Sequence, residues 1–169
     1  MDKRYIPATN IIMYGLVLIL VVNFIWFFNQ KPLSDNLKLK QVEGEITFYY
    51  SESVTEDRGD AGVYYVDNVY IVKGDIKEPD IISVLEHLDK IKSRKRISGY
   101  GNILTHITGM SKVYIEFNVD NDFYSYILTD RDNIMRCHSP ETGKIINITL
   151  NNGDFETIAS VIKLYGELQ

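Results

Sequence analysis

The chain has few of the residues that crosslink small domains or hold metal ions. It contains one cysteine, Cys137, and three histidines, His87, His106 and His138, among 169 residues. A single cysteine excludes an internal disulfide. The histidines also lack the i, i+4 spacing of a helical zinc pair. We therefore expect no metal and no cofactor.

Charged residues are missing from a long N-terminal segment. No Asp, Glu, Lys or Arg occurs from Tyr5 to Gln30, and residues 11–28 are apolar apart from Asn23. As a helix these residues would rise about 27 Å, close to the ~30 Å hydrocarbon core of a bilayer. The pattern predicts a single-pass transmembrane anchor over 11–28 in contact with lipid, after a short tail over 1–10.

The charges flanking this segment give little information on its orientation. Two cations precede it and three follow it, at Lys3, Arg4, Lys31, Lys38 and Lys40. A short tail, a first apolar helix and a large following domain are typical of a signal anchor, in which the N-terminus stays in the cytoplasm. We therefore expect an extracytoplasmic domain.

Asn23 is the one polar side chain in the apolar segment. It is a candidate for a hydrogen bond to a partner helix, which is worth roughly 0.6–2 kcal/mol in lipid. The alternative is that it bonds water or its own backbone.

Positive charge is scarce in the rest of the chain. Residues 41–169 carry 13 Lys and Arg against 21 Asp and Glu, a net charge of −8. Such a domain repels phosphate groups, so we expect no nucleic acid partner. Roughly 130 residues are enough for one domain with one core, and we expect it over 42–169, after a polar linker over 29–41.

Hydrophobic periodicity predicts two helices in this domain. The first opens at Glu78-Pro79-Asp80 and runs to about Ile91, with apolar residues at helical spacing. The second runs from Phe155 to about Tyr165, after Asp154. Both are amphipathic, and we expect them to cover one face of a sheet.

Seven short strands are predicted around these helices. Alternation of apolar and polar residues is clearest at Val113–Val119, and turn-forming residues separate the strands that follow. The fold class is therefore α+β, an N-terminal single transmembrane helix followed by a small domain with an antiparallel sheet in the order three strands, helix, four-strand meander, helix. The predicted strands are Val42–Tyr50, Val63–Val66, Val69–Lys73, Val113–Val119, Phe123–Thr129, Ile134–His138 and Ile145–Leu150.

Catalytic candidates are few. Cys137 and His138 are adjacent in a predicted strand, so their side chains point to opposite faces and do not form a nucleophile–base pair. Cys137 with His106 remains geometrically possible. Asp120 and Asp122 in one turn, or Asp130 and Asp132 in the next, could hold a weak Ca²⁺, although the EF-hand spacing is missing.

Two charged segments are candidate docking surfaces. The stretch from Ser51 to Gly62 is acidic and contains Gly59 and Gly62, which predicts a loop whose candidate surface runs from Glu52 to Asp60. The run from Lys90 to Arg96 is basic and is expected at a helix end, where cations suit the helix dipole. We favour the basic run, so the candidate partner-binding residues are Lys92, Arg94, Lys95, Arg96 and Asn23.

The sequence thus favours a non-catalytic, membrane-tethered binding module that acts in a protein complex, with a protein as the partner. One alternative is a small membrane-anchored enzyme that uses Cys137 and His106, or a metal bound by turn carboxylates. Another is a structural subunit of a membrane complex, in which Asn23 and the anchor matter more than the domain.

Overall fold

The computed structural model describes residues 8–97 and 109–169. The chain divides into two compact units, with the boundary between Gln30 and Lys31. The first unit contains one helix, α1 (Ala8–Phe28). Its described side chains, from Ile12 to Ile25, are all exposed. His106 lies outside the described residues.

The predicted membrane anchor is contradicted. Within the described part of the chain, in which α1 contributes side chains from Ile12 to Ile25, no helix is both long enough and apolar enough to cross a bilayer. This finding overturns the expected transmembrane helix over 11–28, its single-pass localisation and the exported domain. The lipid contact expected for these residues depends on the same span.

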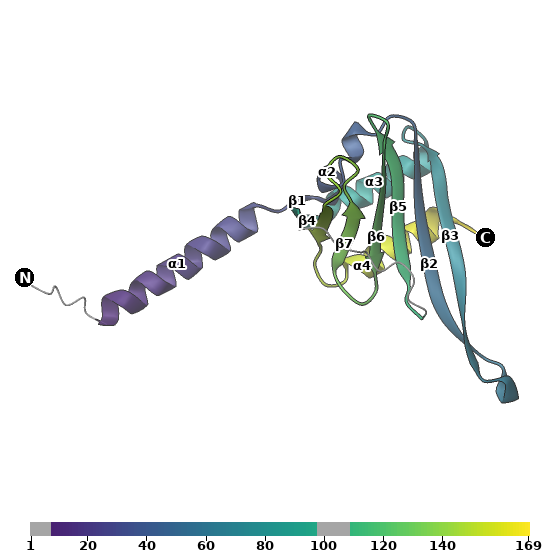
Figure 1. Cartoon of the computed structure of the whole chain (residues 1–169), viewed down its shortest axis with the longest axis horizontal. Coiled ribbons are helices and arrows are strands. Elements are labelled where there is room, and N and C mark those ends of the chain that lie inside the picture. The colour runs from purple at the N-terminus through teal and green to yellow at the C-terminus, as the bar shows by residue number, and fades with distance from the viewer. Residues whose placement is uncertain (1–7, 98–108) are drawn as a thin grey trace, which may run out of the picture. The chain divides into compact units, whose positions relative to one another are not determined.

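The second unit is mainly an antiparallel β-sheet (Figure 1). Among the described residues the sheet has nine strands in the order β1-β4-β8-β7-β6-β5-β2-β3-β9. The predicted fold class is therefore wrong in strand number and in the role given to the N-terminal helix. The strands are β1 (Lys31–Pro32), β2 (Glu45–Asp57), β3 (Val63–Asp75), β4 (Lys92–Ile97), β5 (Lys112–Val119), β6 (Asp122–Thr129), β7 (Ile134–His138), β8 (Ile145–Thr149) and β9 (Glu167–Leu168).

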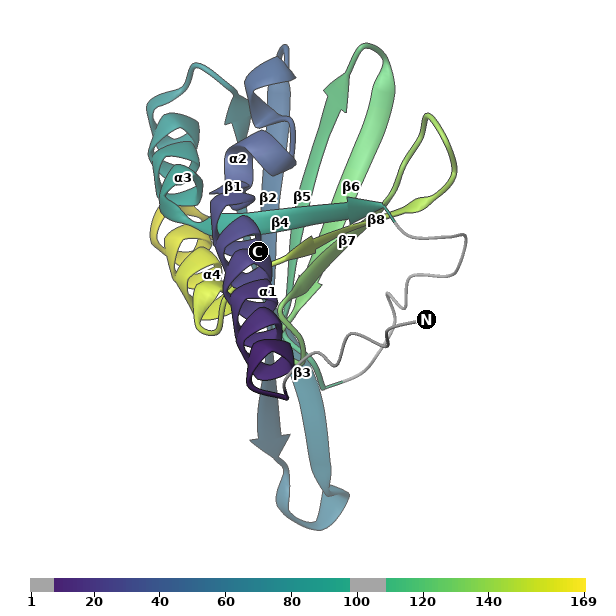
Figure 2. The same ribbon diagram turned by 90° about the vertical axis from the view of Figure 1, so that its left-hand side faces the viewer.

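The helices of this unit lie on one side of the sheet (Figure 2). Each helix buries apolar residues at helical spacing in the core. These include Ile81 and Leu88 of α3, and Ile158 and Ile162 of α4. Both helices begin and end within one or two residues of their predicted limits. The helices and 3-10 turns are α2 (Leu33–Asn36), η1 (Leu39–Gln41), η2 (Gly59–Ala61), α3 (Pro79–Lys90) and α4 (Asp154–Tyr165).

The core lies between these helices and the sheet face that bears alternate apolar residues. Strand β5 shows this pattern most clearly, with four buried residues from Val113 to Val119 separated by more exposed ones. Phe117 stacks on Tyr124 and Tyr126 of β6, with ring centroids 5.6 Å and 6.1 Å away. These aromatic contacts join the two central strands.

The segment expected to be a linker is part of this core. Leu33, Leu37 and Leu39 have at most 1% of their surface exposed. The structure holds this segment in place with polar contacts as well, since Ser34 donates a hydrogen bond to Asp89 of α3 and Asn36 donates one to Ser93 of β4. The few leucines of this largely polar segment are therefore among its buried residues.

Candidate functional site

The basic run occupies strand β4 rather than a helix end, since α3 ends at Lys90. Its side chains therefore alternate between the two faces of the sheet. Arg94 and Arg96 lie opposite Thr149 and Asn147 of β8, whereas Lys95 lies opposite the buried Ile148. The predicted cationic cluster is thus divided between two faces.

Lys95 belongs to a polar group at the edge of the core. Burial lowers the pKa of Lys95, and the nearby Lys38 lowers it further. Lys38 is 2.9 Å from Glu141, and the Tyr124 hydroxyl donates a second hydrogen bond to the same carboxylate. The neighbouring Tyr126 hydroxyl is buried without a hydrogen-bond partner in the described structure. This group connects elements that are distant in the sequence.

Asn23 bonds within its own helix. Its side-chain amide donates a hydrogen bond of 2.8 Å to the carbonyl of Ile19. This arrangement corresponds to the alternative in which the backbone of the same helix, rather than a partner helix, satisfies the amide.

Cys137 is held as a thiol. It is 1% exposed, and its Sγ donates to the carbonyl of His138 at 3.0 Å. Burial raises the pKa of the thiol to about 11, so the nucleophilic thiolate is disfavoured at neutral pH. His106, its proposed base, lies outside the described residues.

The carboxylates of Asp130 and Asp132 support local structure. Asp130 accepts a hydrogen bond from the backbone N–H of Ser111 at 3.0 Å, and Asp132 forms an ion pair of 2.7 Å with Arg136. In residues 8–97 and 109–169 no group of three or more His, Cys, Asp or Glu side chains is placed to hold a metal ion.

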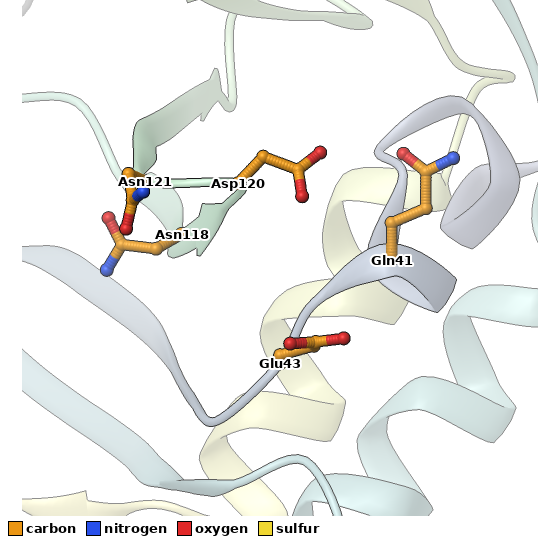
Figure 3. A pocket seen from close by; sticks show the side chains of 5 residues that line it. All are labelled: Gln41, Glu43, Asn118, Asp120 and Asn121. Carbon is orange, nitrogen blue, oxygen red and sulfur yellow. The ribbon is translucent and has the colours of Figure 1, made fainter.

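A shallow polar pocket lies between the end of η1, with the residues after it, and the β5–β6 turn (Figure 3). Its volume is about 530 Å³. The sequence marks Asp120 as a turn carboxylate but does not indicate its partners in the pocket, because the two segments that form it are nearly 80 positions apart. Its two carboxylates and three amides could accept hydrogen bonds from a cationic group. The lining residues are Gln41, Glu43, Asn118, Asp120 and Asn121.

The most prominent surface is a β-hairpin where a loop was expected. Strands β2 and β3 pair over their full length, from Glu45↔Asp75 to Asp57↔Val63. Their distal half extends beyond the rest of the sheet (Figure 1). We call residues 52–68 the hairpin arm.

The turn of the hairpin arm explains why glycine is placed there. Gly59 and Gly62 have φ angles of +61° and +90°, which residues with a side chain rarely adopt. The carboxylate of Asp57 accepts a hydrogen bond from the N–H of Gly59, and the N–H of Arg58 donates to the carbonyl of Gly62. These contacts close the hairpin, so the glycines that suggested a loop form only its tip.

Within the described part of the chain, the two strands of the arm pair only with each other over most of its length. The β2–β5 pairing ends at Ser51↔Lys112, and the β3–β9 pairing covers Tyr70 and Ile71. Beyond those points, the described structure places no strand beside residues 54–57 or 63–68. An isolated two-stranded ribbon is marginally stable in water.

The arm also exposes apolar and aromatic side chains. Val63 is 63% exposed, Tyr65 58% and Tyr64 47%, with Val54 at 38%. The ring of Tyr65 lies against Gly109, where an added Cβ would come within 2.9 Å of it. The guanidinium of Arg58 lies over the ring of Tyr64, 5.4 Å from the ring centroid, in a cation–π contact.

Negative charge dominates the arm. It carries five carboxylates against one cation, Arg58. Arg58 pairs with Glu56, and Glu52 pairs with Lys163 of α4. Asp60 and Asp67 are exposed and form no ion pair among the described residues.

The comparisons with known proteins provide no relative from which a function could be transferred. No protein-family model matches the chain, and no curated protein or solved structure matches it.

Proposed function

We propose that this chain is a non-catalytic binding module that engages a protein partner through the hairpin arm. The observation that carries the proposal is the arm itself, a projecting ribbon with exposed Val63, Tyr64 and Tyr65 and with no neighbouring strand at its outer edges in the described structure. Tyrosine is enriched among the residues that dominate protein interfaces.

The open edges of the arm favour a protein partner. An extended segment of a partner could pair with β3 between Val63 and Asn68. It would satisfy the backbone N–H and C=O groups along that edge. The same contact would bury apolar side chains of the arm. Both effects stabilise a ribbon that is only marginally stable on its own.

The charge of the arm specifies the chemistry of the partner surface. Because Asp60 and Asp67 form no ion pair within residues 8–97 and 109–169, a basic surface gains attraction that an acidic or phosphate-bearing one does not. A nucleic acid is disfavoured for the same reason, since residues 41–169 have a net charge of −8.

The properties of Cys137 favour binding over thiol catalysis. A buried thiol whose pKa is raised to about 11 is a poor nucleophile at neutral pH. An interaction surface needs no such group and relies on exposed residues, which the arm provides.

Site-specific photocrosslinking in native cells tests the proposal. A photoreactive phenylalanine analogue replaces Tyr65 in the arm or, as a matched control, Leu164 on the exposed face of α4, which is 73% exposed. We expect a discrete covalent protein adduct at position 65 and none at position 164. No adduct at 65, or equal adducts at both positions, would contradict the proposal.

A further inference from the structure

We infer that the basic surface that receives the hairpin arm belongs to a second copy of this chain. This inference rests on the proposed binding function of the arm and identifies its partner. The surface is the basic edge, which we define as Lys90, Lys92, Arg94 and Arg96, at the end of α3 and on β4.

The basic edge has cations available for a partner. The side chains of Lys90, Lys92 and Arg96 are exposed, and none of these three forms an ion pair within the described residues. Its positive charge is concentrated in a domain that is otherwise strongly acidic. The arm, in which Asp60 and Asp67 form no ion pair with another described residue, is complementary to it.

The arm and the basic edge of one copy are far apart. Strand β4 is separated from β2 by β8, β7, β6 and β5. At ~4.8 Å between neighbouring strands, the path through the sheet is about 24 Å. Figures 1 and 2 both show the arm extending away from β4. The two surfaces therefore meet most directly between two molecules.

Charge also decides how two copies would associate. Pairing of one arm with another would bring Asp60 and Asp67 against the same carboxylates, and like charges in contact are unfavourable. Arm against basic edge joins opposite charges. Such a contact uses a different surface on each copy, so it is heterologous and leads to a ring or an open chain of molecules.

A zero-length crosslinker that joins carboxylates to lysine amines tests this contact. Full-length chain is prepared with normal and heavy nitrogen, and the two are mixed in a mild non-ionic detergent that covers the exposed side chains of α1. We expect crosslinks that combine a normal and a heavy peptide and join Asp60 or Asp67 to Lys90 or Lys92. The yield should fall about tenfold in 1 M salt, where charges are screened within ~3 Å.

Reversed charges provide the specific test. D60K/D67K makes the arm basic, K92E/R96E makes the edge acidic, and each variant alone should lose these crosslinks. In an equal mixture, crosslinks should return between positions 60 or 67 of the first variant and 92 or 96 of the second. The matched control E86K/E156K, which alters exposed carboxylates of α3 and α4, should keep the wild-type crosslinks. Circular dichroism checks that each variant is folded.

The outcomes separate this inference from the proposed function. Absence of mixed-isotope crosslinks in the wild-type chain, or no return in the mixture of folded variants, overturns self-association. A photocrosslinked adduct at Tyr65 whose mass matches a different protein also overturns it, yet leaves the binding function supported. Absence of any adduct at Tyr65 rejects both.

Discussion

Lys38 and Glu141 are 103 positions apart in the sequence, and their charged groups lie 2.9 Å apart. The contact fastens the segment after α2 to the turn between β7 and β8. Lys38 adopts a left-handed backbone conformation, with φ of +63°, and its ammonium also lies 5.5 Å from the ring centroid of Tyr124.

This contact makes stability depend on pH. The hydrogen bond from Lys38, with a second one from Tyr124, holds the pKa of Glu141 below its ordinary value of 4.5. A lowered pKa in the folded state contributes stability that is present above the unfolded pKa and is lost as pH falls through the folded value. We expect Glu141→Gln to destabilise the protein at pH 6 and to have less effect at pH 3. Urea denaturation at both pH values measures this difference.

A matched substitution serves as the control for that experiment. Glu86→Gln removes an exposed carboxylate of α3 that makes no described side-chain contact. Its effect on the urea midpoint should be small at both pH values. If Glu141→Gln behaves like this control, the ion pair with Lys38 contributes nothing measurable.

Two phenylalanines on neighbouring strands should differ sharply in their contribution to stability. Phe117 is 2% exposed and Phe123 is 56% exposed. Phe117→Ala should cost about 3–5 kcal/mol, since it leaves a cavity against Tyr124 and Tyr126. Phe123→Ala should change stability by less than about 0.5 kcal/mol. Denaturant unfolding of both variants gives the two values, and equal losses would show that the β5–β6 core is packed differently.

The domain should require the segment before β2 in order to fold cooperatively. A fragment of residues 31–169 retains Leu33, Leu37 and Leu39, whereas a fragment of residues 43–169 lacks all three. Because burial of each leucine is nearly complete, we expect only the longer fragment to unfold cooperatively. In the longer fragment, Leu37→Ala should cost about 2–5 kcal/mol. Cooperative unfolding of the shorter fragment at the same midpoint would make the segment a true linker.

Cys137 should be nearly inert in the folded chain. With its pKa raised to about 11, roughly one thiol in a thousand is ionised at pH 8. We expect slow alkylation by iodoacetamide at pH 8 and fast alkylation in 8 M urea, measured by mass spectrometry. Rapid labelling of the folded chain would show that the thiol reaches solvent and would reopen a catalytic role for it.

The sequence by itself determined the elements whose pattern is local. Alternating residues from Val113 to Val119 could fit only a strand with one buried face, and β5 occupies that segment. The apolar spacing of α3 and α4 likewise located both helices, because a period of 3.6 residues is visible within a single segment. The single cysteine and the acidic charge were also fixed without a structure.

Elements that depend on distant partners were missed. Residues 51–57 contain acidic residues and no clear alternation, yet they form a strand because each lies opposite a residue of β3 in a ladder of 13 pairs. The basic run seemed to continue a helix, but pairing with β8 makes it β4. Such pairing is set by contacts between segments, which no local period records.

The candidate surfaces show most clearly what the sequence indicates and what the fold decides. The sequence showed where charge is concentrated, but strand geometry divided Arg94 and Lys95 between two faces and extended Asp60 and Asp67 away from the sheet. The residue type sets the charge of a side chain, whereas the fold sets the face to which that side chain points and the groups that surround it. Only the tertiary structure, through pairing of segments distant in sequence, decided which charged groups share a surface.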